Sequence, residues 1–194
     1  MRNILLAILI ITSINCFGQE KYWEQLNQTE KNKILNNPDV VPYALKFFKG
    51  NYDLNQDSLV LDFLDKISLN KSKELLPFYY FLFIKMCKEA DGYIGETLGD
   101  CCINFLLNHS NFVLKHIRQE IKNGRNDEYN YFKDNMIFEY YASDLESSYP
   151  NRPNYNDFVK ILETKTNNEN KILLRKLMKE VKLGALKMIE EDKK

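Results

Sequence analysis

Residues 75–89 read LLPFYYFLFIKMCKE and form the most apolar of the helices that the sequence predicts. Apolar side chains would occupy nearly every side of this helix, and a helix of that kind is buried all round. Lys85, Lys88 and Glu89 end the apolar run well short of the ~20 residues that a membrane crossing needs. We therefore expect 75–89 to be the central helix of a folded domain, with Pro77 in its first turn.

The same helical spacing of apolar residues recurs on both sides of this stretch, whereas strand signals are nearly absent. We find no fixed repeat period. The sequence thus predicts one all-α domain of about eight or nine helices, arranged as an irregular orthogonal bundle or as a short α-solenoid of helical hairpins. The expected helices cover residues 23–35, 42–48, 58–67, 75–89, 93–107, 111–122, 132–145, 157–163 and 168–191.

Local stop and start signals set several of these boundaries. Ser110 is expected to cap the helix 111–122 and to separate it from 93–107, and Asn154 is expected to cap the helix that follows it. Gly124 stands where a helix commonly ends in a left-handed residue.

The first eighteen residues have the order of a secretory signal peptide. Arg2 precedes an unbroken apolar run, 4–11, and Cys16 and Gly18 are small residues at positions −3 and −1 of a cleavage after Gly18. We expect residues 1–18 to be a cleavable leader and 19–194 to be the exported domain, in the periplasm or outside the cell. Lipidation of Cys16 is a less favoured alternative, because the residues before it fit a lipoprotein signal poorly.

Size and charge narrow the classes of function. Removing 18 of the 194 residues leaves a chain long enough for one sizeable core. The 27 basic residues balance 27 acidic ones, so the chain lacks the net basic field that nucleic-acid binding requires.

Three cysteines remain after the leader: Cys87, Cys101 and Cys102. In an oxidising compartment a bridge from Cys87 to Cys101 or to Cys102 is expected if the two helices that carry them form a hairpin. The alternative is three buried free thiols that pack as small apolar side chains.

The segment 91–102, DGYIGETLGDCC, holds three of the seven glycines. Gly95 and Gly99 lie on one helical face, where missing side chains would let another backbone approach closely. Glu96 and Asp100 share the neighbouring face and form a possible carboxylate pair for a cation or a proton. Two solvated acids beside a close helix contact are the more common outcome of such a pattern.

The loop 147–156, SSYPNRPNYN, supplies a candidate interaction surface made of Tyr149, Arg152 and Tyr155. Tyr and Arg are the residue types that anchor protein interfaces, because each covers a large area with few rotatable bonds. The competing interpretation is that these tyrosines are half-buried plugs between helices and loop.

The terminal helix, 168–191, has an apolar stripe on one side and basic residues on the other. Such a helix either packs its stripe on the domain or lies on an anionic membrane surface, and packing is the expectation favoured here. The basic residues are Lys171, Arg175, Lys176, Lys179, Lys182 and Lys187, with Glu180 among them.

The sequence carries no recognisable catalytic motif. It has neither a phosphate-binding P-loop nor the G-x-S-x-G or S-x-x-K pattern of serine nucleophiles. His109 and His116, the only histidines, lack the paired spacing of a zinc site. We therefore expect no metal and no cofactor.

These patterns favour an exported, non-catalytic protein that binds another protein as an adaptor, an inhibitor or an immunity-type protein. Two alternatives stay open. One is a peripheral or lipid-anchored envelope protein. The other is a cell-wall or glycan hydrolase using acids that the sequence does not single out, with Glu89, Glu96 and Glu139 as candidates.

Overall fold

The computed structural model describes residues 20–52, 57–90, 92–143, 145–146 and 153–194. These residues form eight α-helices and one 3-10 turn, without a strand, in a single compact domain. The all-α prediction is confirmed. The elements are η1 Trp23–Gln25, α2 Gln28–Leu35, α3 Pro42–Phe48, α4 Asp57–Ser68, α5 Leu76–Glu89, α6 Gly92–Lys122, α7 Asp127–Ala142, α8 Tyr155–Lys165 and α9 Asn168–Glu191.

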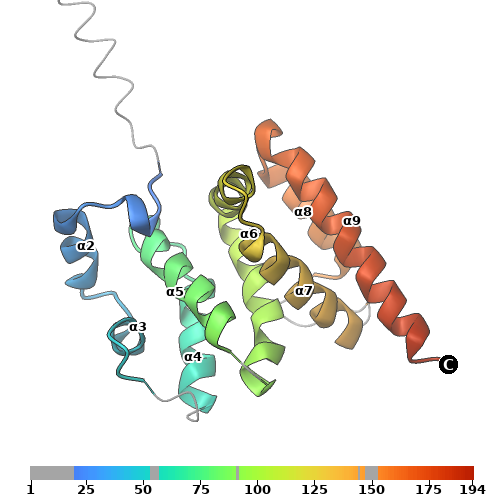
Figure 1. Cartoon of the computed structure of the whole chain (residues 1–194), viewed down its shortest axis with the longest axis horizontal. Helices are drawn as coiled ribbons and strands as arrows, with labels where there is room; N and C mark the ends of the chain where they lie inside the picture. Colours follow the sequence, from blue (N-terminus) through green and yellow to red (C-terminus); the bar gives the residue numbers. More distant parts are fainter. Residues whose placement is uncertain (1–19, 53–56, 91, 144, 147–152) are drawn as a thin grey trace, which may run out of the picture.

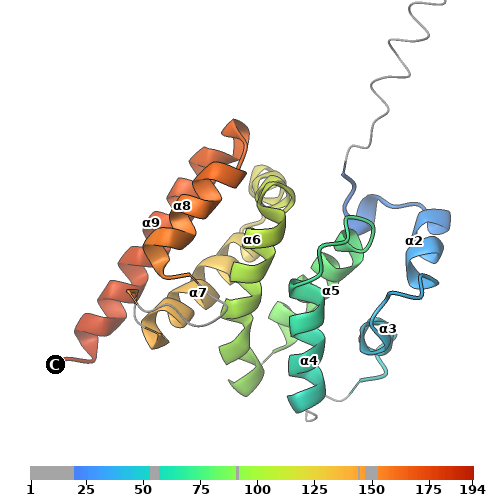
Figure 2. The ribbon, with the colours of Figure 1, turned by 180° about the vertical axis from the view of Figure 1, so that it is seen from behind.

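The helices follow one another along the long axis of the molecule in nearly the order of the sequence (Figure 1). Helices α2 and α3 lie at one end, α4 and α5 come next, α6 lies in the middle, and α7, α8 and α9 form the other end. The view from behind shows the same succession (Figure 2). Helix α6 is the hub, because it packs against α4, α7, α8 and α9.

Helix α5 is buried as its composition predicts, but the expectation that it is the central helix is wrong, because α6 holds that position. One ring of α5 contacts both α6 and α7. Phe83 packs on Phe105 of α6 with ring centroids 4.9 Å apart and on Phe132 of α7 at 5.8 Å. The buried side chains of α5 are Leu76, Phe78, Tyr79, Tyr80, Leu82, Phe83, Ile84 and Met86.

Side-chain caps and one glycine fix several helix ends. The Asn154 side chain accepts a hydrogen bond from the Asp157 backbone N–H at the start of α8, and Gly124 has φ +78° after α6, as expected. The expected first helix is divided instead. The Asn27 side chain accepts from the Glu30 N–H while the Glu30 carboxylate accepts from the Asn27 N–H, so a new helix starts after the η1 turn.

Helix α6 bends at His109, whose backbone leaves the helical region at φ −140° and ψ 34°. The break expected before Ser110 therefore exists, as a kink one residue earlier. The ring Nε2 of His109 lies 2.7 Å from the carbonyl oxygen of Asn70, which fixes the bend to the segment after α4.

Two glycines allow helix α7 to pack closely on both neighbours. A Cβ built on Gly99 of α6 would lie 2.5 Å from the Cβ of Glu139 and 2.8 Å from the backbone oxygen of Asn135. The close approach predicted at Gly99 is confirmed, but the same prediction for Gly95 is wrong, since no described atom beyond its own stretch of helix lies within 4 Å of its added Cβ. In the same way, a Cβ built on Gly184 of α9 would lie 2.4 Å from the Cδ1 of Ile137.

The apolar stripe of α9 packs on the domain, as favoured above. Its buried members are Leu174, Leu177, Met178, Val181 and Ala185. Among the helices of the described ranges, none has both the length and the apolar content that a membrane crossing requires.

Candidate functional site

A pocket of about 510 Å³ opens between the η1 segment, α5, α6 and the start of α7. This volume lies within the range of sites that hold a small molecule or a single large side chain. Five of its lining residues are aromatic, namely Tyr22, Trp23, Tyr80, Phe81 and Phe112.

The aromatic walls come from parts of the chain that lie far apart in sequence. Trp23 packs on Phe78 of α5 at a centroid distance of 4.8 Å and edge-on to Phe48 of α3 at 5.6 Å. Tyr22 lies against His116 at 4.0 Å and against Phe112 at 4.8 Å, both on α6. These ring contacts hold the η1 segment against α5 and α6, so the pocket wall is part of the core.

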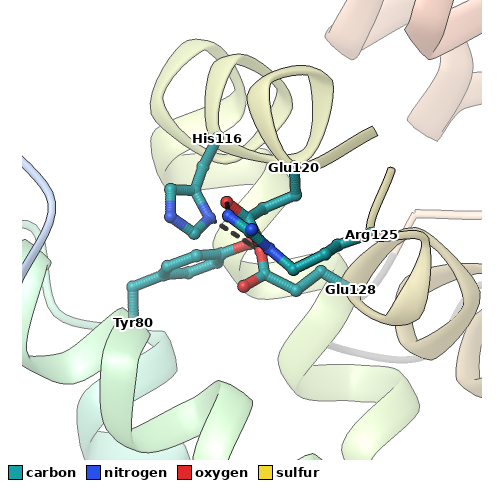
Figure 3. A network of polar contacts seen from close by, with 5 residues as sticks. All are labelled: Tyr80, His116, Glu120, Arg125 and Glu128. Carbon is teal, nitrogen blue, oxygen red and sulfur yellow. Dashed lines mark hydrogen bonds and ion pairs between the residues drawn. The ribbon is translucent and has the colours of Figure 1, made fainter. Parts of the chain in front are cut away.

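A polar network lies in the pocket where α5, α6 and α7 meet (Figure 3). The His116 Nδ1 lies 2.7 Å from Glu128 Oε2, and the Tyr80 hydroxyl donates to the same oxygen at 3.2 Å. His116 and Glu128 are both largely buried. Burial raises the pKa of Tyr80 well above its usual value, and the charge of Glu128 raises it further, so the phenol remains a donor.

An ion pair completes the network. Arg125, which follows α6, donates from Nη2 to Glu120 Oε1 at 2.7 Å, and its Nε binds the other oxygen of that carboxylate. This hydrogen bonding lowers the pKa of Glu120. The pKa of Arg125 is raised by Glu120 first and by Glu128 in addition, so the guanidinium interacts with both acids.

The pocket therefore combines an apolar wall with polar groups that are paired with one another. The wall can accept an aromatic or branched aliphatic group, because burying such a group removes apolar surface from water. A histidine bonded to a carboxylate is also the pair that enzymes use to move protons.

No protein-family model matches the chain, and no curated protein or solved structure matches it either.

Sequence reasoning missed this network. Its five members, Tyr80, His116, Glu120, Arg125 and Glu128, come from α5, α6, the turn after α6 and α7. The local signal was weak: His116 and Glu120 lie one helical turn apart, which places them on one face of α6. Only the packing of α5 and α7 against that face makes it a site.

The pKa of each of the three thiols is raised above its usual value. Cys101 and Cys102 are buried and Cys87 is half-buried, and all three are free in the structure. Burial is the main cause that raises each pKa, to about 12 for Cys101, and the neighbouring thiols raise those of Cys87 and Cys102 further. The pKa of Cys87 responds to Cys101 and that of Cys102 to Cys87, so these thiols are within electrostatic range, and the bridge from Cys87 stays a prediction.

Only one member of the predicted carboxylate pair, Glu96 and Asp100, has a described side chain. The Glu96 side chain lies outside the described residues, whereas Asp100 is exposed on α6. Burial raises the pKa of Asp65 on α4, and the charges of Asp100 and Asp62 raise it further, so Asp100 faces the acids of α4. Among the described side chains, no group of three or more His, Cys, Asp or Glu could hold a metal ion.

Tyr155 is not part of an exposed surface, and that prediction is wrong. Its side chain is 6% exposed, its hydroxyl donates to the Met178 carbonyl at 2.6 Å, and its ring lies edge-on to Tyr140. The hydrogen bond to α9 satisfies the hydroxyl and allows the whole ring to be buried. Tyr149 and Arg152 lie outside the described residues.

Two of the acids considered for hydrolysis lie away from the pocket. Glu89 accepts a hydrogen bond from the Tyr52 hydroxyl, and Glu139 packs beside Gly99. Neither lines the pocket, whose acids are Glu24, Glu120, Asp127 and Glu128.

Proposed function

We propose that this protein is an exported, non-catalytic binding protein, acting as an adaptor or an inhibitor, that holds an apolar side chain of a partner protein in the aromatic pocket. The observation that carries the proposal is the five-ring wall around a space of about 510 Å³. Anchor side chains bury themselves in pockets of this kind and contribute much of the affinity of protein interfaces.

The surroundings of the pocket support a protein partner. Gln119, Asn123 and Lys88 line the pocket and are exposed, so polar side chains surround an apolar interior. Protein interfaces have this arrangement, in which a desolvated centre is enclosed by a polar rim. Export is proposed on the order of charged, apolar and small residues in 1–18.

Trp23 supplies the test, because it is the only tryptophan and it lines the pocket. We expect N-acetylphenylalaninamide and N-acetylleucinamide to change its fluorescence saturably, and N-acetylglycinamide to leave it unchanged. At about 0.3 kcal/mol per non-hydrogen atom, the dissociation constants of the two apolar probes should be roughly millimolar.

A pocket-filling variant locates the binding. Gln119→Tyr places a ring at the exposed edge of the pocket, whereas Lys122→Tyr adds the same ring on α6 outside it. We expect the first substitution to abolish the fluorescence response and the second to preserve it. A wild-type protein without any saturable response, or equal responses in both variants, would contradict the proposal.

A second candidate is glycan hydrolysis, which the presence of Glu120 and Glu128 in one pocket beside His116 favours. Release of soluble fragments from peptidoglycan should then be lost in Glu128→Gln and retained in Glu190→Gln, an exposed acid of α9. Absence of turnover by the wild-type protein would leave the binding function as the proposal.

A further inference from the structure

Helix α9 exposes a second apolar row on the side away from its buried stripe. Ile172, Leu183 and Leu186 are 81%, 57% and 38% exposed. At 100° per residue Ile172 and Leu183 point in nearly the same direction, and at 1.5 Å per residue they lie about 16 Å apart along the axis. Helix α9 lies at the opposite end of the molecule from α2, so this face is an outer edge (Figures 1 and 2).

Basic side chains surround the exposed row. Over its full length, 168–191, the helix has six cations and four carboxylates, which are Glu169, Glu180, Glu190 and Glu191. Three of the cations have acidic partners: Arg175 binds Glu163, Lys176 lies 4.0 Å from Glu180, and Lys187 lies 3.7 Å from Glu191.

Two further lysines have no acidic partner among the described residues, so their charge is available to a binding partner. Lys179 and Lys182 are exposed, and neither has an ion pair with another described residue. The Lys182 Nζ lies only over the ring of Tyr155, 5.6 Å from its centroid. Glu190 is also exposed and points in the same direction as Ile172, but these two lysines outnumber it, so the excess charge of this face is positive.

We propose that the outward face of α9 rests on an anionic lipid bilayer. Lysines on such a face bind lipid phosphates, while isoleucine and leucine enter the boundary between headgroups and acyl chains. A second copy of the chain fits this face poorly, because the same lysines would oppose one another. The site is independent of the proposed function, since no residue of α9 lines the pocket.

The test is flotation of the protein with lipid vesicles. The chain without residues 1–18 is used, because it keeps every described residue and removes a stretch that would itself enter lipid. Phosphatidylcholine vesicles that contain about 30% phosphatidylglycerol should bind it, and pure phosphatidylcholine vesicles should bind it at least tenfold less.

Two pairs of variants separate the apolar from the charged contribution. Ile172→Ser with Leu183→Ser, and Lys179→Gln with Lys182→Gln, should each reduce partition into the anionic vesicles by about tenfold or more. Matched controls are Leu59→Ser with Leu69→Ser, which are exposed apolar residues elsewhere, and Lys49→Gln with Lys122→Gln. Both controls should bind like the unmodified protein, and circular dichroism should show the same helix content in all four variants.

Loss of binding in both α9 variants and retention in both controls would support the proposal. No binding to anionic vesicles would overturn it. Binding that survives Ile172→Ser with Leu183→Ser, together with equal binding to heparin, would overturn it in favour of attraction to any polyanion. Gln119→Tyr, which fills the pocket, should leave vesicle binding unchanged.

Discussion

Tyr22 buries its ring and its hydroxyl together, and the hydroxyl has no hydrogen-bond partner among the described residues. An unsatisfied buried hydroxyl is costly, and burial accordingly raises the pKa of this phenol far above its usual value. We expect Tyr22→Phe to raise the free energy of unfolding by about 1 kcal/mol, measured by urea denaturation.

Tyr80→Phe provides the contrast at the other side of the pocket. Its hydroxyl does donate, to Glu128, so its removal should lower the free energy of unfolding. Equal effects of the two substitutions would show that the Tyr22 hydroxyl is satisfied after all.

We expect His109 to make the stability of the fold depend on pH. Burial lowers its pKa in the folded protein, against a smaller opposite effect of the hydrogen bond to Asn70. The unfolded chain therefore takes up the proton at higher pH than the folded one, and the free energy of unfolding should fall as pH drops below about 6.5. Urea denaturation at a series of pH values measures the decline.

His109→Gln should remove part of this decline, because its amide N–H can still reach the Asn70 carbonyl but does not titrate in this range. His116→Gln is the control for the second histidine. A decline that is unchanged in His109→Gln would contradict the assignment.

At the scale of single elements, the two glycines of α6 differ sharply. Gly99→Ala would force a Cβ against the Asn135 carbonyl oxygen and the Glu139 Cβ, so it should destabilise the domain by about 1–3 kcal/mol. Gly95→Ala meets open space inside a helix and should stabilise it by roughly 0.5–1 kcal/mol. Thermal unfolding followed by circular dichroism compares the two; effects of the same sign would show that α6 and α7 are less closely packed.

Helices α5 and α6 also carry the thiol prediction. If Cys87 is bridged to Cys101 or Cys102, the exported protein should show one titratable thiol in denaturant without reductant and three after reduction. Three thiols before reduction would reject the bridge. In the folded, reduced protein all three should react slowly, because burial raises each thiol pKa.

The elements show where sequence reasoning succeeds. Asn154 and Gly124 act through backbone groups within a few residues, so their roles follow from local sequence. Tyr155 and the Tyr80–His116–Glu128 network depend on partners 12 to 48 residues away, which no local pattern specifies. Gly95 and Gly99 are equivalent on a helical wheel, and only the path of α7 distinguishes them.

For the whole molecule, the compact packing of the described helices is consistent with the bundle, one of the two architectures that the sequence predicts. Buried side chains from Tyr22 to Ala185 form one connected cluster, as in a bundle. We expect Trp23 fluorescence, which reports on one end, and far-ultraviolet circular dichroism, which reports on all helices, to give coincident unfolding curves. Separate midpoints would indicate that the ends unfold independently, as in a solenoid.

Helix α7 packs closely on α6 at Gly99 and on α9 at Gly184, and its first turn contains Glu128. Asn135 and Glu139, which contact Gly99, lie about 10–16 Å from Glu128 along the axis of α7. A shift of α7 at these contacts would therefore also move Glu128, because both lie on one continuous helix. We expect a methyl group added at Gly99 or Gly184 to displace Glu128 relative to His116, so substitutions outside the pocket should change what the pocket binds.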